Sequence, residues 1–315
     1  MPKPCIIIHG GAGSIKPSIW REYRDGSHQA ALAGQAVLDK GGSALDAAIA
    51  ATLYLEDDIA FNAGTGSALN LNGDVENDAL VMTDDLSCGA IAGVTGIKNP
   101  VLLARLVMEK TPHHLIVGPG AEALARQHGL TTCDPAEMVV KRRYESYKIA
   151  KDKSMAYGEN PELSLSATDA RPGSDDETSD TVGACALDAA GRLAVASSTG
   201  GIQLKLPGRS GDTPVIGGGS YCGPAGAATC TGHGESAMRV CLAKYAYDLL
   251  AHGATAAEAA QRSVDHLVST IKGRSGLVII DARGNRGWAT STSRIAVGIP
   301  ESKPEENYGA LAASN

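Results

Sequence analysis

Apolar residues recur along the chain with two different periods, which predicts a mixture of strands and helices. Residues 5–9 are Cys-Ile-Ile-Ile-His, an apolar run that predicts a buried strand, and a glycine turn is expected after it at residues 10–13. Helical spacing of small and apolar residues predicts a helix over residues 27–39. Ser43, with Asp46 three positions later, is typical of the N-terminus of a second helix.

Two further helix starts carry capping signals. Asn99 followed by Pro100 predicts the first turn of another helix, since asparagine is a common N-cap and proline a common first helical residue. Thr255 with Glu258 matches a capping box. The helix after it is amphipathic, with one face expected at Ala260, Val264, Leu267, Val268 and Ile271.

Two β-hairpins are predicted in the C-terminal half, at residues 182–197 and 277–290, where apolar runs flank turns that contain Asp, Ala and Gly. The predicted helices lie between groups of strands and do not alternate strictly with them. This order favours an α+β fold, with separate layers of helices and sheets, over a regular doubly wound α/β fold.

A polar segment divides the chain. Residues 151–180 contain no Val, Ile, Phe or Trp, and their second half is acidic and rich in turn formers, so a flexible linker is expected there. The linker ends abruptly at Asp180, and Thr181 begins an apolar strand.

A threonine at such a boundary has two interpretations. β-branched residues often begin strands, which would make Thr181 purely structural. Cleavage of the Asp180–Thr181 bond would instead make Thr181 an N-terminal nucleophile, because its freed α-amine could serve as the base that a hydroxyl requires near neutral pH.

Three glycine-rich loops after Thr181 favour the second interpretation. They cover residues 198–201, 208–212 and 229–235, and each joins glycines to polar side chains. Glycine lets a ligand approach the backbone, whose N–H groups can bind an oxyanion. Arg209 and Asp212 on one loop could hold the carboxylate and the ammonium of an amino acid.

Composition narrows the class of protein. The chain has 315 residues, a formal net charge of -7, 38 glycines and one phenylalanine. It has no apolar run long enough to span a membrane and no basic stripe for nucleic acid, so neither partner is expected. Seven cysteines without a CxxC pair predict buried free thiols rather than a zinc or dithiol site. The N-terminus does not resemble a signal peptide, which predicts a cytoplasmic protein.

Several of these segments together resemble the plant-type asparaginase/isoaspartyl aminopeptidase family of N-terminal nucleophile (Ntn) hydrolases. The matching residues are 9–13, 55–58, 61–64, 99–101, 104–109, 181–184, 198–201, 208–209, 211–212 and 231–235. The resemblance implies a single domain over residues 1–315 with a four-layer αββα sandwich, autoprocessed into an α subunit of residues 1–180 and a β subunit of residues 181–315. It also implies hydrolysis of L-asparagine and of β-aspartyl (isoaspartyl) dipeptides, no organic cofactor, and a dimer of αβ heterodimers.

The resemblance assigns catalytic roles to residues of the β subunit. It implies that Thr181 is the nucleophile and, through its freed amine, the base, and that Thr199 orients it. Thr231 and the Gly232 N–H would form the oxyanion hole, in which the loss of one donor typically lowers the rate by about 10²–10³.

Substrate binding is implied for the same loops. Arg209 would bind the α-carboxylate, and Asp212 with the Gly234 carbonyl would bind the α-ammonium. Further residues of these two loops that are expected at the substrate are Ser210, Gly211, Thr231, Gly232 and His233, of which His233 is expected to make a structural or subsite contact.

The N-terminal half would supply the surroundings of the cleavage site and a metal site. The cleaved bond joins Asp180 to Thr181, and Asn62, Gly10 and Gly11 are expected beside it. The resemblance also implies a structural Na⁺ bound by the backbone carbonyls of Leu55, Glu56, Asp58, Phe61, Ala63 and Thr65.

The chain departs from the family pattern in three places. Asp180 stands where the family mostly has glycine, Ser210 stands where a small apolar residue is usual, and residues 288–294 keep only part of the pattern. Asp-Thr is the junction of the related glycosylasparaginases, so an enzyme of that type is one alternative. A homologue that does not cleave itself and acts as a binder is another.

Other motifs are expected to be structural. His113 and His114 are predicted at the surface, and His9 is predicted to tether the glycine turn rather than to ionise. A dinucleotide fingerprint fails at its last glycine, where Lys16 stands. The acidic residues 175–177 are interpreted as part of a solvated linker rather than as a calcium site.

Overall fold

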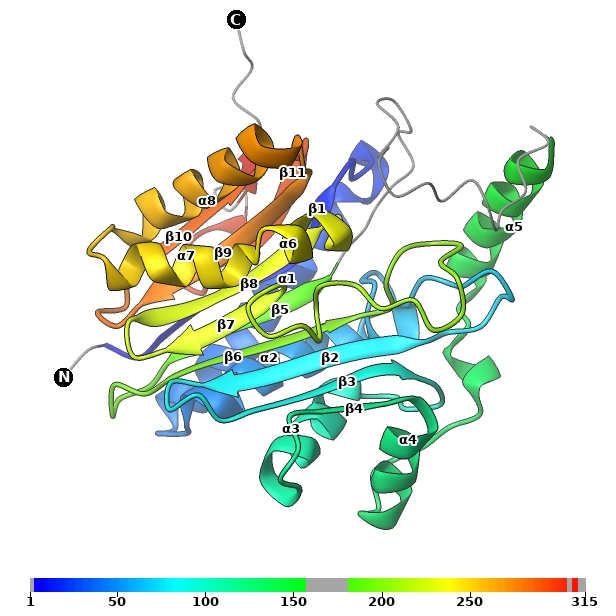
Figure 1. Ribbon diagram of the computed structural model, residues 1–315, viewed down its shortest axis with the longest axis horizontal. Helices are drawn as coiled ribbons and strands as arrows, with labels where there is room; N and C mark the ends of the chain where they lie inside the picture. The colour runs from blue at the N-terminus through cyan, green and yellow to red at the C-terminus, as the bar shows by residue number, and fades with distance from the viewer. Residues whose placement is uncertain (1–2, 157–180, 305–307, 311–315) are drawn as a thin grey trace, which may run out of the picture.

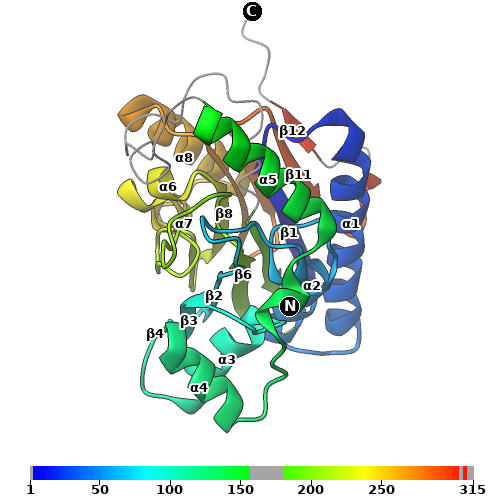
Figure 2. The same cartoon turned by 90° about the vertical axis from the view of Figure 1, so that its right-hand side faces the viewer.

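The computed structural model describes residues 3–156, 181–304 and 308–310. Within them the chain forms two β-sheets that contact each other, with helices packed against each sheet (Figures 1 and 2). The fold therefore belongs to the mixed α and β class that the sequence predicts.

The larger sheet holds the predicted N-terminal strand and the first predicted hairpin. Its strands are β1 (Cys5–Gly13), β2 (Asn77–Thr83), β3 (Cys88–Val94), β4 (Leu115–Val117), β5 (Val182–Leu187), β6 (Leu193–Thr199), β11 (Arg294–Gly298) and β12 (Tyr308–Ala310). Among the described residues they lie in the order β12-β11-β1-β5-β6-β2-β3-β4. The pairing of β3 with β4 is parallel and that of the central strands is antiparallel.

The smaller sheet holds the second predicted hairpin. Its strands are β7 (Ser220–Gly223), β8 (Gly226–Gly232), β9 (Ser275–Asp281) and β10 (Arg286–Thr290), in the antiparallel order β10-β9-β8-β7. β8 and β9 contact β1 and β5 of the larger sheet, and β7 contacts β6 and β2, so the two sheets face each other.

Most of the described helices pack against one of the two sheets. They are α1 (Pro17–Asp39), α2 (Ala44–Asp57), α3 (Pro100–Lys110), α4 (Gly118–Gln127), α5 (Lys141–Ala156), α6 (Gly234–Arg239), α7 (Leu242–Ala251) and α8 (Ala256–Ile271), with short 3₁₀ turns at Gly64–Gly66 and Pro135–Met138. α1, α2 and α3 pack on the larger sheet, and α7 and α8 pack on the smaller one. No helix in the described part of the chain is long and apolar enough to cross a membrane.

The isoleucine run of β1 is buried on both faces of its sheet. Ile6 and Ile8 belong to the apolar cluster that includes residues of α1 and α2, whereas Ile7 belongs to the cluster between the two sheets. Successive side chains of a strand point to opposite faces, so an uninterrupted apolar run suits a strand that is covered on both sides. A further cluster joins the smaller sheet to α7 and α8.

The predicted caps and hairpins are confirmed. The Ser43 hydroxyl accepts a hydrogen bond from the Asp46 N–H at the start of α2, and Thr255 and Glu258 form both bonds of a capping box at the start of α8. Asn99 takes the N-cap position of α3 without a side-chain cap bond. The strand pairs β5–β6 and β9–β10 are antiparallel, as predicted.

The glycine turn predicted at residues 10–13 is wrong, because β1 continues to Gly13. Ala12 pairs with Ile295 of β11 after an irregularity in the register that follows His9. Gly11 has a φ of 124°, in the region that glycine tolerates. The glycines therefore produce an irregular strand rather than a turn, since β11 supplies pairing that the local sequence does not reveal.

The predicted start of the linker is also wrong, because α5 extends past residue 151 to Ala156. The Lys151 ammonium donates to the Tyr147 hydroxyl one turn earlier, at 2.7 Å, and lies over the same ring. The remainder of the expected linker, residues 157–180, lies outside the described residues.

Two helical predictions need smaller corrections. α1 begins at Pro17 rather than near residue 27, and its added turns bury Tyr23. Val268, predicted on the buried face of α8, is 42% exposed. The buried stripe of α8 passes through Val264 and Leu267 and leaves Val268 at its edge.

Candidate active site

Thr181 lies immediately before β5, near the middle of the larger sheet. β5 pairs with β1 on one side and with β6 on the other, and this pairing brings the ends of β1 and β6 close to Thr181. Only 5% of the Thr181 surface is exposed. The ladder hydrogen bonds on both sides of β5 thus fix the backbone next to the candidate nucleophile.

His9 anchors the carbonyl of Thr181. The buried His9 ring has Nδ1 at 3.0 Å from the Thr181 carbonyl oxygen and Nε2 at 3.3 Å from the Thr229 hydroxyl oxygen. Because a carbonyl only accepts, the assignment that fits is a proton on Nδ1 and a bond donated by Thr229 to Nε2. Burial lowers the pKa of His9 to about 3, although the bond to Thr181 acts in the opposite direction. The ring is therefore a neutral tether, as predicted, but what it holds is Thr181.

One pocket brings together residues that are far apart in the sequence. Thr199 lies in it at the end of β6, and its Oγ1 accepts a hydrogen bond from the Gly201 N–H at 3.0 Å. All lining residues except Gly201 and Ile202 were expected at the site from the sequence. The lining residues are Thr181, Thr199, Gly201, Ile202, Arg209, Gly211, Asp212, Gly232 and Gly234.

Thr231 and Gly232 end β8 beside this pocket. The Thr231 hydroxyl oxygen accepts a hydrogen bond from the Ala12 N–H at 3.2 Å, which leaves the hydroxyl hydrogen available for donation. Gly232 has a φ of 125°, and a Cβ there would lie 2.7 Å from the Ser275 Cα. Only glycine fits this position, so the backbone can approach a bound group closely.

Arg209 is held by a residue that the sequence analysis did not select, Glu235. Arg209 donates from Nε and Nη2 to the two Glu235 oxygens, at 2.9 and 2.7 Å, in the two-pronged geometry typical of arginine and carboxylate. Burial raises the pKa of Glu235, but the charge of Arg209 and the hydrogen bonds from Arg209 and from its own backbone N–H together outweigh burial, so the net shift of the pKa is downward. The only sequence signal for Glu235 was its place in the segment 231–235.

Asp212 is the perturbed acid of the pocket. The residue is 3% exposed, and burial raises the pKa of its carboxyl to about 7. Its own backbone N–H and the Arg209 charge oppose this rise, whereas the charges of Glu235 and Asp78 add to it. Perturbed acids cluster at functional sites, so Asp212 is a strong candidate for contact with a charged ligand.

Three predicted substrate contacts, Thr231, Ser210 and His233, do not line the pocket, and the side chains of the last two are engaged by its neighbours. The Ser210 hydroxyl donates to the Asp78 carboxylate at 2.9 Å. The His233 ring bonds the Ser236 hydroxyl through Nδ1 at 2.8 Å and lies 3.3 Å from a Glu235 oxygen through Nε2. Both side chains therefore contact neighbours of the pocket residues.

Of the residues expected around the cleavage site, Asn62 contacts a residue that lines the pocket, and Asp180 is outside the described residues. The Asn62 amide donates to the Gly201 carbonyl at 2.6 Å and accepts from the Ala68 N–H at 2.7 Å. Gly10 lies against the only phenylalanine, since a Cβ there would be 2.5 Å from a Phe61 ring carbon. Gly11 lies in the irregular part of β1 next to His9.

The loop expected to bind Na⁺ follows the C-terminal end of α2. The last carbonyls of a helix have no partner within it and carry its partial negative charge. Among the described residues no N–H donates to the carbonyls of Leu55 or Glu56. The carbonyls of Asp58 and Ala63 each accept one backbone N–H, which leaves each a second lone pair.

The shape of this loop also fits a cation with oxygen ligands. Gly64 has a φ of 54°, and a Cβ there would lie 2.6 Å from the Glu56 carbonyl oxygen, so glycine allows carbonyls to converge. Neutral carbonyl oxygens suit hard cations. No cluster of three or more His, Cys, Asp or Glu side chains that could hold a metal occurs in the described parts of the chain.

The remaining predictions concern histidines and cysteines. His113 and His114 are exposed, as predicted. The cysteines, which all lie in the described ranges, are free thiols, but Cys133 is only half-buried and Cys241 is exposed, so burial of the whole set is wrong. The acidic residues 175–177 lie outside the described residues.

Comparisons with known proteins identify the family of the chain. A family model described as asparaginase matches residues 2–310. The isoaspartyl peptidase/L-asparaginases of Bos taurus and Homo sapiens are each 42% identical, over 92% of this chain and 91% of theirs. The plant-type L-asparaginase of Pyrococcus abyssi is 40% identical, over 92% of this chain and 94% of its own. The chain therefore belongs to the asparaginase family, whose members hydrolyse amide bonds.

Proposed function

We propose that the protein is an autoproteolytic amidohydrolase that converts L-asparagine to L-aspartate and ammonia and cleaves β-aspartyl dipeptides. The observation that carries the proposal is that Thr181 lines one pocket together with Thr199, Arg209, Asp212 and Gly232. Thr181 supplies a nucleophile for the side-chain carbonyl of an aspartyl substrate, and the Gly232 N–H can bind the resulting oxyanion. The charges of Arg209 and Asp212 match the α-carboxylate and the α-ammonium. The names of the relatives point to the same two substrate classes.

Activation begins with cleavage of the Asp180–Thr181 bond. Residues 1–180 become the α subunit and residues 181–315 the β subunit of a single domain. The new α-amine of Thr181, with an ordinary pKa of about 7.7–8.0, takes the proton from the Thr181 hydroxyl. The neutral His9 takes no part in this transfer, and its bond holds the Thr181 carbonyl in place.

Hydrolysis then proceeds in two steps. The Thr181 Oγ attacks the side-chain carbonyl carbon of the substrate, and ammonia or the peptide amine leaves with the proton from the Thr181 amine. Water next attacks the acyl-enzyme ester and releases aspartate. The Thr231 hydroxyl and the Gly232 N–H stabilise the oxyanion in both steps, while Thr199 orients Thr181.

The substrate is recognised through its α-amino acid part. Arg209 binds the α-carboxylate, and Asp212 with the Gly234 carbonyl binds the α-ammonium. Glu235 keeps the guanidinium plane of Arg209 in place through its two hydrogen bonds. Both substrate classes share this aspartyl part, so one pocket serves both.

Three further properties belong to the proposal. The packing of α1 and α2 on one sheet and of α7 and α8 on the other supports a four-layer αββα arrangement. The carbonyls after α2 would hold a structural Na⁺ that fixes the loop leading to Asn62. A cytoplasmic dimer of αβ units is the expected form.

A denaturing gel with an activity assay tests the proposal. Purified wild-type protein is expected to give bands near 18 and 14 kDa, the shares of 32.2 kDa before and after the Asp180–Thr181 bond, and to release ammonia from L-asparagine. Thr181→Ala is expected to give one band and no ammonia, whereas Thr181→Ser keeps a hydroxyl and retains both activities in part.

The same experiment separates the alternatives. A wild-type protein that remains a single band and is inactive would be a silent homologue and would overturn the proposal. Cleavage together with activity on a glycosylated asparagine, but not on L-asparagine, would indicate a glycosylasparaginase.

A further inference from the structure

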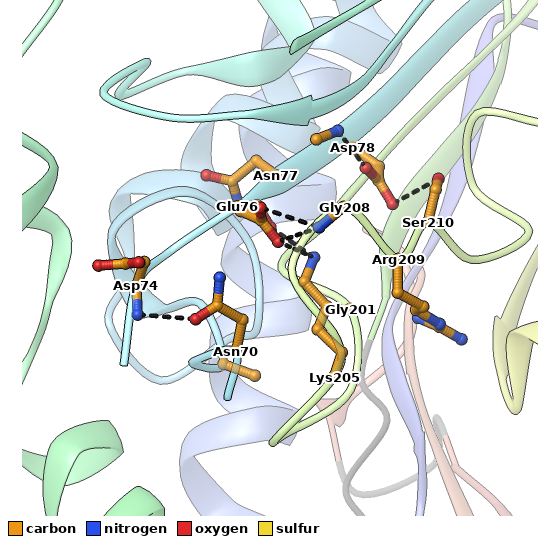
Figure 3. A network of polar contacts seen from close by, with 12 residues as sticks. Asn70, Asp74, Glu76, Asn77, Asp78, Gly201, Lys205, Gly208, Arg209 and Ser210 are labelled. Atoms are coloured by element: carbon orange, nitrogen blue, oxygen red, sulfur yellow. Dashed lines mark hydrogen bonds and ion pairs between the residues drawn. The ribbon is translucent and has the colours of Figure 1, made fainter. Parts of the chain in front are cut away.

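The loop that carries Arg209 is held by the side chains of Glu76, which immediately precedes β2, and of Asp78 in β2, as Figure 3 shows. Asp78 is the second residue of β2 and is fully buried. Its backbone pairs with Thr199 at the end of β6. Asp78 therefore joins the two pocket segments, the end of β6 and the loop, without lining the pocket itself.

The Asp78 carboxylate accepts three hydrogen bonds. Its Oδ1 accepts from the Gly93 N–H at 2.8 Å, and its Oδ2 accepts from the Ser210 hydroxyl at 2.9 Å and from the Gly211 N–H at 3.3 Å. Hydrogen bonds to an ionised acceptor are roughly twice as strong as neutral ones. The carboxylate therefore ties the loop firmly to β2 and β3.

A second carboxylate holds the loop on the other side of Arg209. Both Glu76 oxygens accept from the Gly208 N–H, at 3.0 and 3.1 Å, and the buried Lys205 ammonium donates to the Glu76 carbonyl at 2.9 Å. Arg209 thus lies between two residues, Gly208 and Ser210, that are each bonded to a carboxylate of one strand end (Figure 3).

We propose that Asp78 and Ser210 form a positioning pair, whose hydrogen bond sets the geometry in which Arg209 and Asp212 hold the α-carboxylate and α-ammonium of the substrate. The proposal rests on the function proposed above, because it takes its roles for Arg209 and Asp212. The tie is made by two side chains, so it can be removed without changing the backbone of the loop. The pair acts on the aspartyl part of a substrate and not on the leaving group.

Removal of the Ser210 hydroxyl tests the pair. With processed Ser210→Ala, KM for L-asparagine is expected to rise about tenfold, the order of one hydrogen bond to a charged group. kcat is expected to change less than about twofold, because the binding lost is the same in the ground and transition states. KM for a β-aspartyl dipeptide is expected to rise by the same factor, and Ser210→Thr, which keeps a hydroxyl, restores KM.

Asp78→Asn provides a second, stronger perturbation. An amide cannot accept on both sides, so the bond from Gly93 or the bonds from the loop must be lost, and KM is expected to rise more than in Ser210→Ala. The thermal midpoint and the cleavage gel show whether this variant folds and matures. If Asp78→Asn does not fold or mature, the KM values of Ser210→Ala and Ser210→Thr test the positioning role on their own.

Thr83→Val is the matched control. The Thr83 hydroxyl at the far end of β2 donates to the Asp85 carboxylate at 2.6 Å, away from the pocket residues, so its loss is expected to leave KM unchanged. A KM for Ser210→Ala within twofold of wild type, a loss confined to kcat, or an equal rise in Thr83→Val would each overturn the positioning role. If wild type and Thr83→Val both lack activity on L-asparagine, the proposed function itself fails and the inference fails with it.

Discussion

Asp212→Asn removes a buried negative charge and is expected to raise stability while it lowers activity. The pKa of Asp212 rises from 3.8 to about 7 because the carboxyl is buried, and each pKa unit corresponds to about 1.4 kcal/mol. Ionised Asp212 therefore lowers the free energy of unfolding by about 4 kcal/mol above pH 7. The asparagine side chain has no charge to desolvate, so the variant avoids this cost.

The sign of the effect depends on pH. The folded-state pKa lies above the unfolded value, so the unfolded chain loses its proton first and wild-type stability falls as pH rises from about 4 to about 7. Asp212→Asn is expected to match wild type near pH 4 and to exceed it at pH 8. For a chain of this length about 4 kcal/mol corresponds to an increase of roughly 6 °C in Tm.

Calorimetric melting at pH 5 and pH 8 measures this difference. Asp188→Asn is the matched control, because the buried Asp188 carboxylate accepts from the N–H groups of Ala44, Ala190 and Arg192. An amide there loses at least one acceptor, so this control is expected to lower Tm. A Tm of Asp212→Asn below that of wild type at pH 8 would refute the reasoning. A Tm difference from wild type that is the same at pH 5 and at pH 8 would refute it as well.

Activity is expected to change in the opposite direction. Only ionised Asp212 offers a negative charge to the substrate ammonium, so kcat/KM of wild type is expected to fall below pH 7 as Asp212 and the Thr181 amine both take up protons. Asp212→Asn is expected to lower kcat/KM about 10- to 100-fold at pH 8. At lower pH the kcat/KM of this variant is expected to fall with the uptake of one proton, by the Thr181 amine, instead of two. Ammonia release between pH 5 and pH 9 measures both slopes, and unchanged slopes would contradict the assignment.

Three other outcomes are expected. Arg209→Ala raises KM for L-asparagine more than it lowers kcat, since the contact exists in both ground and transition states, and an unchanged KM in initial-rate measurements would count against its role. Exchange of Na⁺ for choline lowers Tm, because an ion bound only by the folded state stabilises it; a Tm that is independent of the cation would argue against the site after α2. Thr255→Ala breaks the capping box of α8 and is expected to lower the free energy of unfolding by about 1 kcal/mol, with no change in activity, as urea unfolding and initial rates would show.

Features that depend on neighbouring residues were predictable from the sequence. The caps at Ser43 and Thr255 need only a hydroxyl and an N–H three positions later, and both hairpins need only two apolar runs and a turn. The pocket could be named because the glycine-rich motifs of a known family occur in this chain in the family's order. Periodicity alone would have left Thr181 as an ordinary first residue of a strand.

Features that depend on distant partners were decided by the tertiary structure. β1 passes through its glycines because β11 pairs with it there. Glu235 and Asp78 gain their roles only when α6, β2 and the Arg209 loop meet, since no spacing along the chain brings these carboxylates to their partners. The pKa values of His9 and Asp212 arise from burial, which is a property of the packed fold. The sequence thus determined which groups this protein can use, and the packing decided which of them are charged, held in place and brought together.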